Sequence, residues 1–195
     1  MNNILDILDS LEKLYEDVED EFSKIGKNYD FNCSGCVTNC CTTLFYHYTF
    51  VEEYMLQFGL SKIKSDIQSS IIENSKRYIF KKDNFSGKGK FKMMCPANKD
   101  GLCMIYRYRP MICRIHGVPS KLTFPNGRVD FYKGCEVMAS KFFEFPFFLD
   151  RTRFFQNLSL IEQKFRKEFG KPLGYKFKKT IAQMILSKDL DSSDV

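Results

Sequence analysis

The stretch Cys33-Ser34-Gly35-Cys36-Val37-Thr38-Asn39-Cys40-Cys41 decides how the rest of this chain is interpreted. It holds four of the eight cysteines of a 195-residue protein, and the others follow at Cys95, Cys103, Cys113 and Cys135. One or two buried cysteines would satisfy a core of this size. Thiols at this density therefore indicate either a disulfide framework or a set of ligands for metal.

The amino-terminal residues favour metal over disulfides. Residues 1–9, Met-Asn-Asn-Ile-Leu-Asp-Ile-Leu-Asp, have no basic start, no apolar run and no small-residue cleavage site, so we predict no secretory signal peptide. Charges interrupt every apolar stretch before it reaches the length of a membrane span. We therefore expect a cytoplasmic protein with no membrane contact, whose thiols stay reduced and take metal ions as partners.

The spacing of the cysteines narrows the kind of metal site. Cys33 and Cys36 form a chelating pair that zinc sites, iron–sulfur sites and redox pairs share, but a redox pair needs a βαβ context that is not predicted here. A zinc ribbon needs a second close pair, whereas the later cysteines are separated by seven, nine and 21 residues. The order also differs from the bacterial ferredoxin and radical-SAM patterns. We expect a site gathered from distant loops, with thiolates enough for two four-thiolate centres.

Adjacent cysteines and the two histidines leave alternatives open. Cys40 and Cys41 point in different directions, so they serve different metal ions or cluster atoms, or one binds metal while the other packs. His47 and His116 are the only histidines, and either could replace a thiolate. For both histidines we favour a core or hydrogen-bonding role over metal ligation.

The combined cysteine pattern resembles a known family. The run Cys33-x2-Cys36-x3-Cys40-Cys41, then Cys95-Pro96, then residues 101–114 (Gly-Leu-Cys-Met-Ile-Tyr-Arg-Tyr-Arg-Pro-Met-Ile-Cys-Arg) is similar to the YkgJ-like cysteine-cluster proteins. That family is described as a zinc- or iron-chelating domain with eight characteristic cysteines, and the match covers residues 31 to 140. The flagellin lysine N-methylases carry a similar cysteine domain, described as holding a four-iron cluster for methyl transfer.

The resemblance implies a metal centre, either a 4Fe-4S iron–sulfur cluster or zinc. The metal ligands that it implies are Cys33, Cys36, Cys40, Cys41, Cys95, Cys103, Cys113 and Cys135. Four thiolates around a divalent zinc or a doubly positive cluster leave a net charge of about −2. We expect Arg107, Arg109 and Arg114 to offset this charge and to donate hydrogen bonds to sulfur, although pairing with surface acids is the alternative.

Apolar periodicity predicts a mainly α fold. The chain is 44% hydrophobic, with 20 Phe and 10 Tyr, which suits one compact domain with a real core. The expected helices cover 3–27, 49–58 with Gly59 as a stop, 61–82 capped by Ser61, 153–169 and 177–187. Residues 121–124 and 128–132, joined by Pro-Asn-Gly, predict one small β-hairpin.

The expected organisation has three parts. Residues 1–30 form an amphipathic helix, 31–140 form the cysteine-cluster metal-binding domain, and 141–195 form helices that pack on the same domain. The helices thus surround an irregular cysteine-rich core. Residues 76–82 mix lysines and aromatics as nucleic-acid surfaces do. With a net charge of only +6, we favour a solvated helix end over nucleic-acid binding.

These features predict a metal centre but do not identify its reaction. No Ser/His/Asp set, phosphate loop or dinucleotide fingerprint is present in the sequence, so any catalysis must come from the metal, and no substrate is indicated. The first hypothesis is an iron–sulfur protein with a redox or group-transfer role, such as methyl transfer. The alternative is a zinc-binding structural or metal-handling module without catalytic activity.

Overall fold

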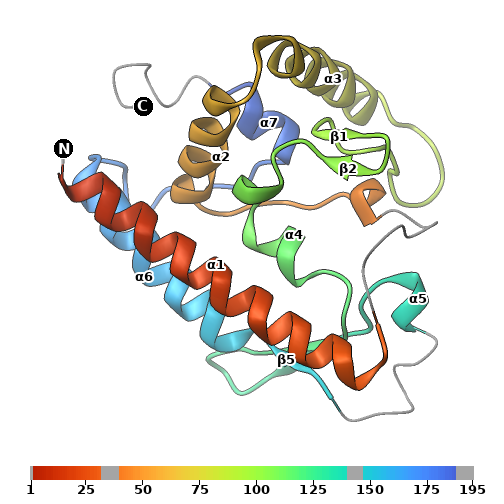
Figure 1. The fold of residues 1–195 in the computed structure, drawn as a ribbon, viewed down its shortest axis with the longest axis vertical. Helices are drawn as coiled ribbons and strands as arrows, with labels where there is room; N and C mark the ends of the chain where they lie inside the picture. Colours follow the sequence, from red (N-terminus) through yellow and green to blue (C-terminus); the bar gives the residue numbers. More distant parts are fainter. Residues whose placement is uncertain (1, 32–39, 140–146, 188–195) are drawn as a thin grey trace. The chain divides into compact units, whose positions relative to one another are not determined.

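The computed structural model describes residues 2–31, 40–139 and 147–187, and it is mainly helical (Figure 1). This confirms that the fold is mainly α, as predicted; the predicted cysteine-rich core around which the helices pack stays a prediction. The helices are α1 (Asn2–Asn28), α2 (Phe50–Lys62), α3 (Ser65–Asp83), α4 (Met111–Ile115), α5 (Glu136–Ala139), α6 (Thr152–Glu168) and α7 (Ile181–Ile185). Two short 3-10 helices, η1 (Cys40–Thr42) and η2 (Tyr106–Tyr108), lie in the cysteine-bearing region.

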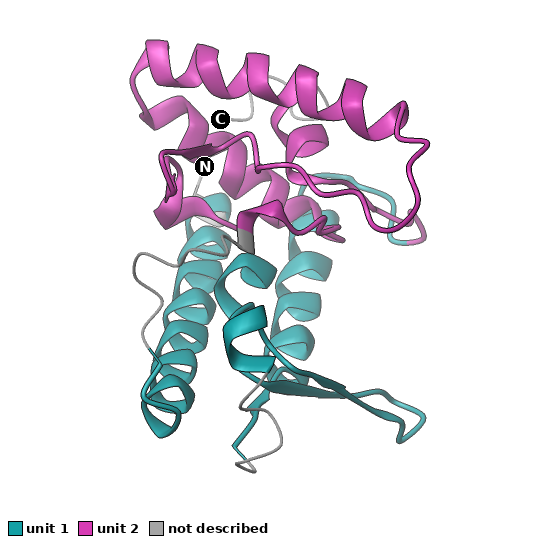
Figure 2. Cartoon of the chain, turned by 90° about the vertical axis from the view of Figure 1, so that its right-hand side faces the viewer, with its two compact units in different colours: residues 1–40, 111–173 teal, residues 41–110, 174–195 magenta. Residues whose placement is uncertain are grey.

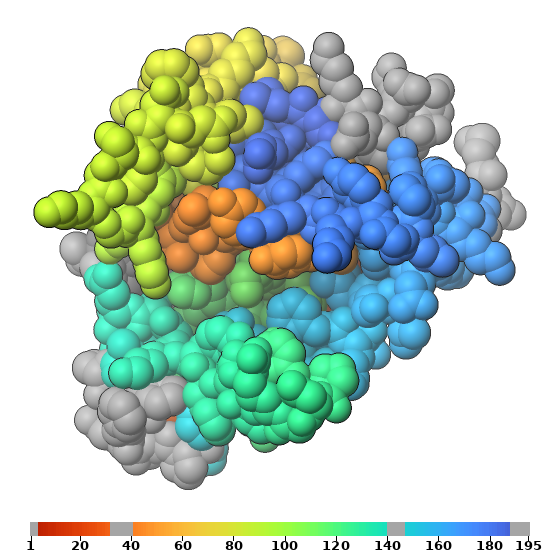
Figure 3. Space-filling model, turned by 180° about the vertical axis from the view of Figure 1, so that it is seen from behind, coloured from red at the N-terminus to blue at the C-terminus, as the bar shows by residue number. Residues whose placement is uncertain are grey.

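The strands form two small sheets. β1 (Asn98–Lys99) pairs antiparallel with β2 (Leu102–Cys103). The second sheet has the order β4-β3-β5, in which β4 (Val129–Tyr132) is antiparallel and β5 (Leu149–Asp150) parallel to the central β3 (Ser120–Thr123). The β3–β4 pair is the predicted hairpin, and its turn lies on the surface in Figure 3. β5 was not predicted, since a two-residue strand leaves no periodic signal.

The chain divides into two compact units, and neither is a continuous stretch of sequence (Figure 2). Unit 1 contains Met1–Cys40 and Met111–Leu173, and unit 2 contains Cys41–Pro110 and Gly174–Val195. The cysteines are therefore divided between the two units, with Cys41, Cys95 and Cys103 in unit 2 and Cys113 and Cys135 in unit 1. Each unit is built by elements that are distant in sequence.

Unit 1 is organised around α1 and α6, which run antiparallel side by side (Figure 1). Leu11 and Val18 of the predicted apolar stripe of α1 are fully buried, and so is Ile7, which was not assigned to that stripe. Phe154 and Phe165 of α6 are buried as well. Apolar residues at this helical spacing collect on one face, and burying that face holds each helix in place.

Unit 2 packs α7 against α2 and α3. Its core includes Val51 and Leu56 of α2, Ile71 of α3, and Ala182 and Met184 of α7. α7 starts later than predicted, because a capping box at Thr180 satisfies the first helical N–H groups and fixes the start there.

The predicted stop of α2 at Gly59 was wrong, as was the predicted cap at Ser61. α2 continues to Lys62, and Gly59 lies inside it. A Cβ added at Gly59 would come within 2.1 Å of Cγ of Tyr108, so the glycine allows the η2 segment to pack directly on the helix backbone. Gly59 therefore positions the arginine-rich segment and does not end the helix.

None of the helices in residues 2–31, 40–139 and 147–187 is long and apolar enough to cross a membrane. The most apolar faces are the buried ones, such as the stripe of α1 that carries Ile7 and Leu11.

Candidate functional site

The structure describes part of the predicted ligand set. Cys33 and Cys36 lie outside the described residues, and the side chain of Cys40 is outside them too. The other five cysteines are thiols outside any disulfide: Cys41, Cys95, Cys103, Cys113 and Cys135. Their thiol state is the form that metal ligation requires, because the metal binds the deprotonated sulfur of a reduced cysteine.

Three of these cysteines come together in unit 2, and we call Cys41, Cys95 and Cys103 the unit 2 cluster. The backbone N–H of Cys95 donates to the carbonyl oxygen of Cys41 over 2.9 Å. The carbonyl oxygen of Cys95 accepts from the N–H of Asn98 at 3.0 Å, and Asn98 lies opposite Cys103 in the β1–β2 ladder. One turn and one short ladder thus join cysteines from three separate segments.

The turn at Cys95 also places a donor on its sulfur. The backbone N–H of Ala97 donates to the Cys95 thiol, which favours the thiolate. Burial acts the other way and is larger, and together with the nearby Cys41 and Cys103 it raises the pKa of Cys95 to about 12. A cation among these sulfurs would offset both effects, so the arrangement favours a bound metal ion over separate thiolates.

The unit 2 cluster is a neighbourhood of thiols and does not form a complete coordination set. Among residues 2–31, 40–139 and 147–187, no three Cys, His, Asp or Glu side chains are arranged closely enough to hold a metal ion. The donors that are present are soft thiols, which suit zinc or iron–sulfur clusters better than calcium or magnesium. The chemistry of the donors fits the expected cofactors.

Cys113 and Cys135 belong to unit 1. Cys113 lies in α4, and the N–H of the buried Cys135 donates to the carbonyl oxygen of Gly117, just after α4, over 3.0 Å. Gly134 has φ +82°, and a Cβ there would lie 2.3 Å from the Gly117 oxygen. Only glycine allows these two segments to approach so closely, and this contact brings Cys135 next to the segment that carries Cys113.

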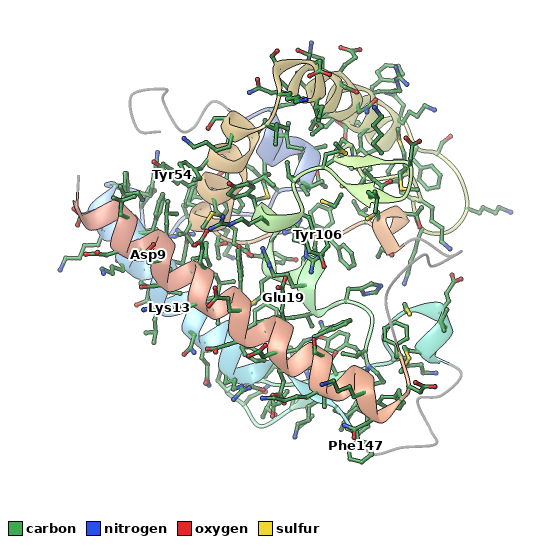
Figure 4. The ribbon with its side chains drawn as sticks, in the orientation of Figure 1. Asp9, Lys13, Glu19, Tyr54, Tyr106 and Phe147 are labelled. Carbon is green, nitrogen blue, oxygen red and sulfur yellow. The ribbon has the colours of Figure 1, made fainter. Side chains whose placement is uncertain are left out.

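The three predicted arginines do not share one environment. Arg114 pairs with Glu19 of α1, which lies on the side of α1 next to α4 (Figure 4), and its guanidinium stacks 4.0 Å from the Tyr15 ring centre. Arg109 stacks 3.6 Å from the ring centre of Tyr106, while Arg107 is exposed. The proposed role of these arginines beside sulfur stays a prediction, and Arg114 shows the acid pairing that was the alternative.

The histidines are held as neutral groups. Burial lowers the pKa of His47 to about 4, and its backbone pairs with Lys179 in both directions, at 2.8 and 3.0 Å. Burial also lowers the pKa of His116 to about 4, with a further contribution from the charge of Arg151. Neutral imidazoles can bind metal. In the described part of the chain, neither histidine belongs to a group of three possible ligands.

Unit 1 also contains two buried polar residues that no sequence pattern had indicated. Arg151 and Ser120 are buried, and each has a polar atom with no hydrogen-bond partner among the described residues. No motif surrounds either residue. Their significance depends on the register of β3 and β5, which the sequence did not predict.

Comparisons with models of protein families, with curated proteins and with solved structures found no match. The resemblance to the YkgJ-like proteins therefore rests on the cysteine pattern alone. The case for a metal centre rests on that pattern and on the unit 2 cluster.

Proposed function

We propose that this chain is a metal-binding cysteine-cluster protein that holds an iron–sulfur centre with a redox or group-transfer role. The observation that carries the proposal is the unit 2 cluster, in which Cys41, Cys95 and Cys103 meet at one turn and one ladder. A core that needed only packing would not gather three thiols in which Cys41 and Cys103 raise the cost of ionising Cys95.

The donors fit the proposed group. Cysteine thiolates are the usual ligands of iron–sulfur clusters, and backbone N–H donors to their sulfurs help to set the reduction potential. The N–H of Ala97 is such a donor at Cys95. When bound, the cluster would supply electron transfer or a site for group transfer, while the residues of this chain bind it, shield it and stabilise its thiolates.

Iron is favoured over zinc by the dispersed spacing of the cysteines. Structural zinc sites commonly use two close pairs, and this chain has one such pair, at Cys33 and Cys36. The later cysteines come singly, from a turn, a ladder and a helix. The resemblance to the methylase cysteine domain supports the same choice.

Metal analysis of anaerobically purified protein tests the proposal. We expect a brown protein that contains iron and acid-labile sulfide, with visible absorption that bleaches on reduction. Protein expressed in zinc-supplemented and iron-supplemented cells should carry iron in both cases. Colourless protein with stoichiometric zinc, even from iron-rich anaerobic cells, would replace this proposal with the zinc-binding structural or metal-handling module.

A further inference from the structure

Arg151, at the amino-terminal end of α6, is a buried cation with no acidic partner among the described residues. Its exposed fraction is 5%, and its Nε has no hydrogen-bond partner. Within the described ranges no carboxylate forms an ion pair with it, and its guanidinium carbon lies 4.3 Å from the ring centre of Tyr132. Burying a guanidinium is costly unless an anion or hydrogen bonds compensate, so an arginine kept in this state calls for a partner.

The sheet places a second unsatisfied group beside this guanidinium. Ser120 of β3 lies opposite Tyr132 of β4 and opposite Leu149 of β5, so the side chains of these residues share one face. Arg151 follows Leu149 by two residues and continues the ladder through its N–H to the Lys121 oxygen at 2.9 Å, which puts it on that same face.

The strand order determines which residue lies beneath the side chain of Arg151. β3 lies between β4 and β5, so an arginine that starts at the end of β5 and stacks on Tyr132 of β4 must pass over β3 at Ser120. Ser120 is fully buried, and its Oγ has no hydrogen-bond partner in the described structure. Two polar groups from neighbouring strands, each without a hydrogen-bond partner among the described residues, therefore lie on one face of the sheet.

His116 lies four residues before Ser120, in the segment that joins α4 to β3, and adds a third polar group to this neighbourhood. The charge of Arg151 helps burial to lower the pKa of His116 to about 4, so the imidazole near Arg151 is neutral at physiological pH. Burial also lowers the pKa of Arg151, to about 10, which leaves it charged at that pH. The neighbourhood carries a single positive charge together with neutral hydrogen-bonding groups.

We propose that Arg151, Ser120 and His116 form a binding site for the carboxylate group of a small organic acid. A guanidinium fork binds a planar carboxylate through two parallel hydrogen bonds, and a serine hydroxyl can donate a further one. One negative charge balances the one positive charge, whereas a phosphate dianion would leave an excess charge buried. With an exposed fraction of only 5%, Arg151 is out of reach of a macromolecular surface, so we commit to a small acid as the occupant. The site goes beyond the proposed metal centre and does not depend on it.

Titration with sodium acetate tests the site on the full chain as purified. The probe is the Nε–Hε resonance of Arg151 in nitrogen-15 spectra, assigned by its loss in Arg151→Lys. We expect this resonance to shift and to saturate at millimolar acetate, at constant ionic strength. Inorganic phosphate and chloride should shift it at least about tenfold less effectively, because neither matches both the charge and the planar fork geometry.

Variants complete the test, with thermal stabilisation by acetate as the second readout. Arg151→Lys keeps the charge but loses the fork and should weaken binding at least about tenfold, and Ser120→Ala should weaken it about threefold. Arg153→Lys is the matched control: this exposed arginine on the same helix pairs with Glu21 at 3.3 Å and should leave binding unchanged. Non-saturating acetate shifts, tighter binding of phosphate, or equal loss in the Arg153 control would each overturn the proposal. If Arg151→Lys does not fold, the acetate affinities of the Ser120→Ala and Arg153→Lys variants still test the proposal.

Discussion

Cys95 is the cysteine for which the structure gives the fullest account of a ligand. Its backbone N–H donates to the carbonyl oxygen of Cys41, and its own carbonyl oxygen accepts from Asn98, which pairs with Cys103 in the β1–β2 ladder. Its sulfur accepts a hydrogen bond from the N–H of Ala97. We predict that Cys95→Ser lowers the metal content at least about tenfold, because a hydroxyl is a poor ligand for a metal that prefers sulfur. Iron, zinc and sulfide analysis of the purified variant is the measurement.

Met94→Ser is the matched control for this substitution. Met94 precedes Cys95 and is 40% exposed, so the same replacement one residue earlier removes neither a thiol nor a core contact. It should retain the metal of the wild type. Full metal content in Cys95→Ser, or equal loss in both variants, would show that Cys95 is not a ligand.

His47 makes the stability of the fold depend on pH. Its folded-state pKa of about 4 lies below the ordinary value of 6.5, so the unfolded chain takes up the proton first as the pH falls. Its stabilising effect is therefore complete above pH 6.5 and is lost as the pH falls toward 4. The loss attributable to His47 is about 2 kcal/mol between about pH 7.5 and about pH 5.

Urea unfolding at these two pH values, for the wild type and for His47→Gln, measures this contribution. His116 has a similarly lowered pKa and remains in both proteins, so it provides a common background. We expect the variant to lose about 2 kcal/mol less stability on acidification than the wild type does. An identical pH dependence in the two proteins would contradict the assignment.

At the scale of elements, periodicity predicted the long helices and failed where tertiary contacts decide. The stripe of α1 and that of α6 repeat over many turns, so both helices were predicted nearly to their ends. Gly59 was interpreted as a stop because glycine is a poor helix former, yet the Tyr108 ring requires it inside α2. The two-residue β5 depends on pairing with β3, and no local sequence pattern predicts that contact.

The contact between the segments at Gly117 and Gly134 can be tested by adding one methyl group. Gly134→Ala forces a left-handed residue and a clash with the Gly117 oxygen, and we predict a loss of about 3 kcal/mol in the free energy of unfolding. Gly127→Ala, in the turn of the β3–β4 hairpin, is the control. Gly127 has the same φ of +82° with nothing within 4 Å, so it should cost only about 1 kcal/mol. Equal losses in urea unfolding would show that the close approach does not matter.

At the scale of the molecule, the sequence indicated which residue types form the candidate site but not which of them are neighbours. The eight cysteines and their soft chemistry were visible at once. That Cys41 meets Cys95, while Cys113 and Cys135 lie in the other unit, depends on how two discontinuous units assemble. Arg151 and Ser120 were missed for the same reason, since only the register of the β4-β3-β5 sheet brings them to one face.

The division into units predicts which part of the protein loses stability when the metal is removed. In unit 1, α1 and α6 are held by buried apolar side chains, and the hydroxyl of Tyr29, just after α1, donates to the carbonyl oxygen of Phe147 at 2.7 Å. Phe147 lies beside the carboxyl-terminal end of α1 (Figure 4). The β1–β2 ladder of unit 2 has only two residues in each strand, so few hydrogen bonds hold it together. The protection of its amides from exchange therefore depends on the cysteine-bearing segments around it. A metal bound by the unit 2 cluster would therefore stabilise this ladder far more than the long helices.

Hydrogen exchange before and after treatment with a chelator measures this difference directly. We expect amides from Cys95 to Met104 to lose at least about tenfold in protection, while those of α1 and α6 change little because their packing does not involve the metal. The same treatment of Cys95→Ser serves as the control and should cause no further loss. If protection falls equally in both units, the metal supports the whole fold. If it falls nowhere, the unit 2 cluster does not hold the metal, and the ligands must be sought among the other cysteines.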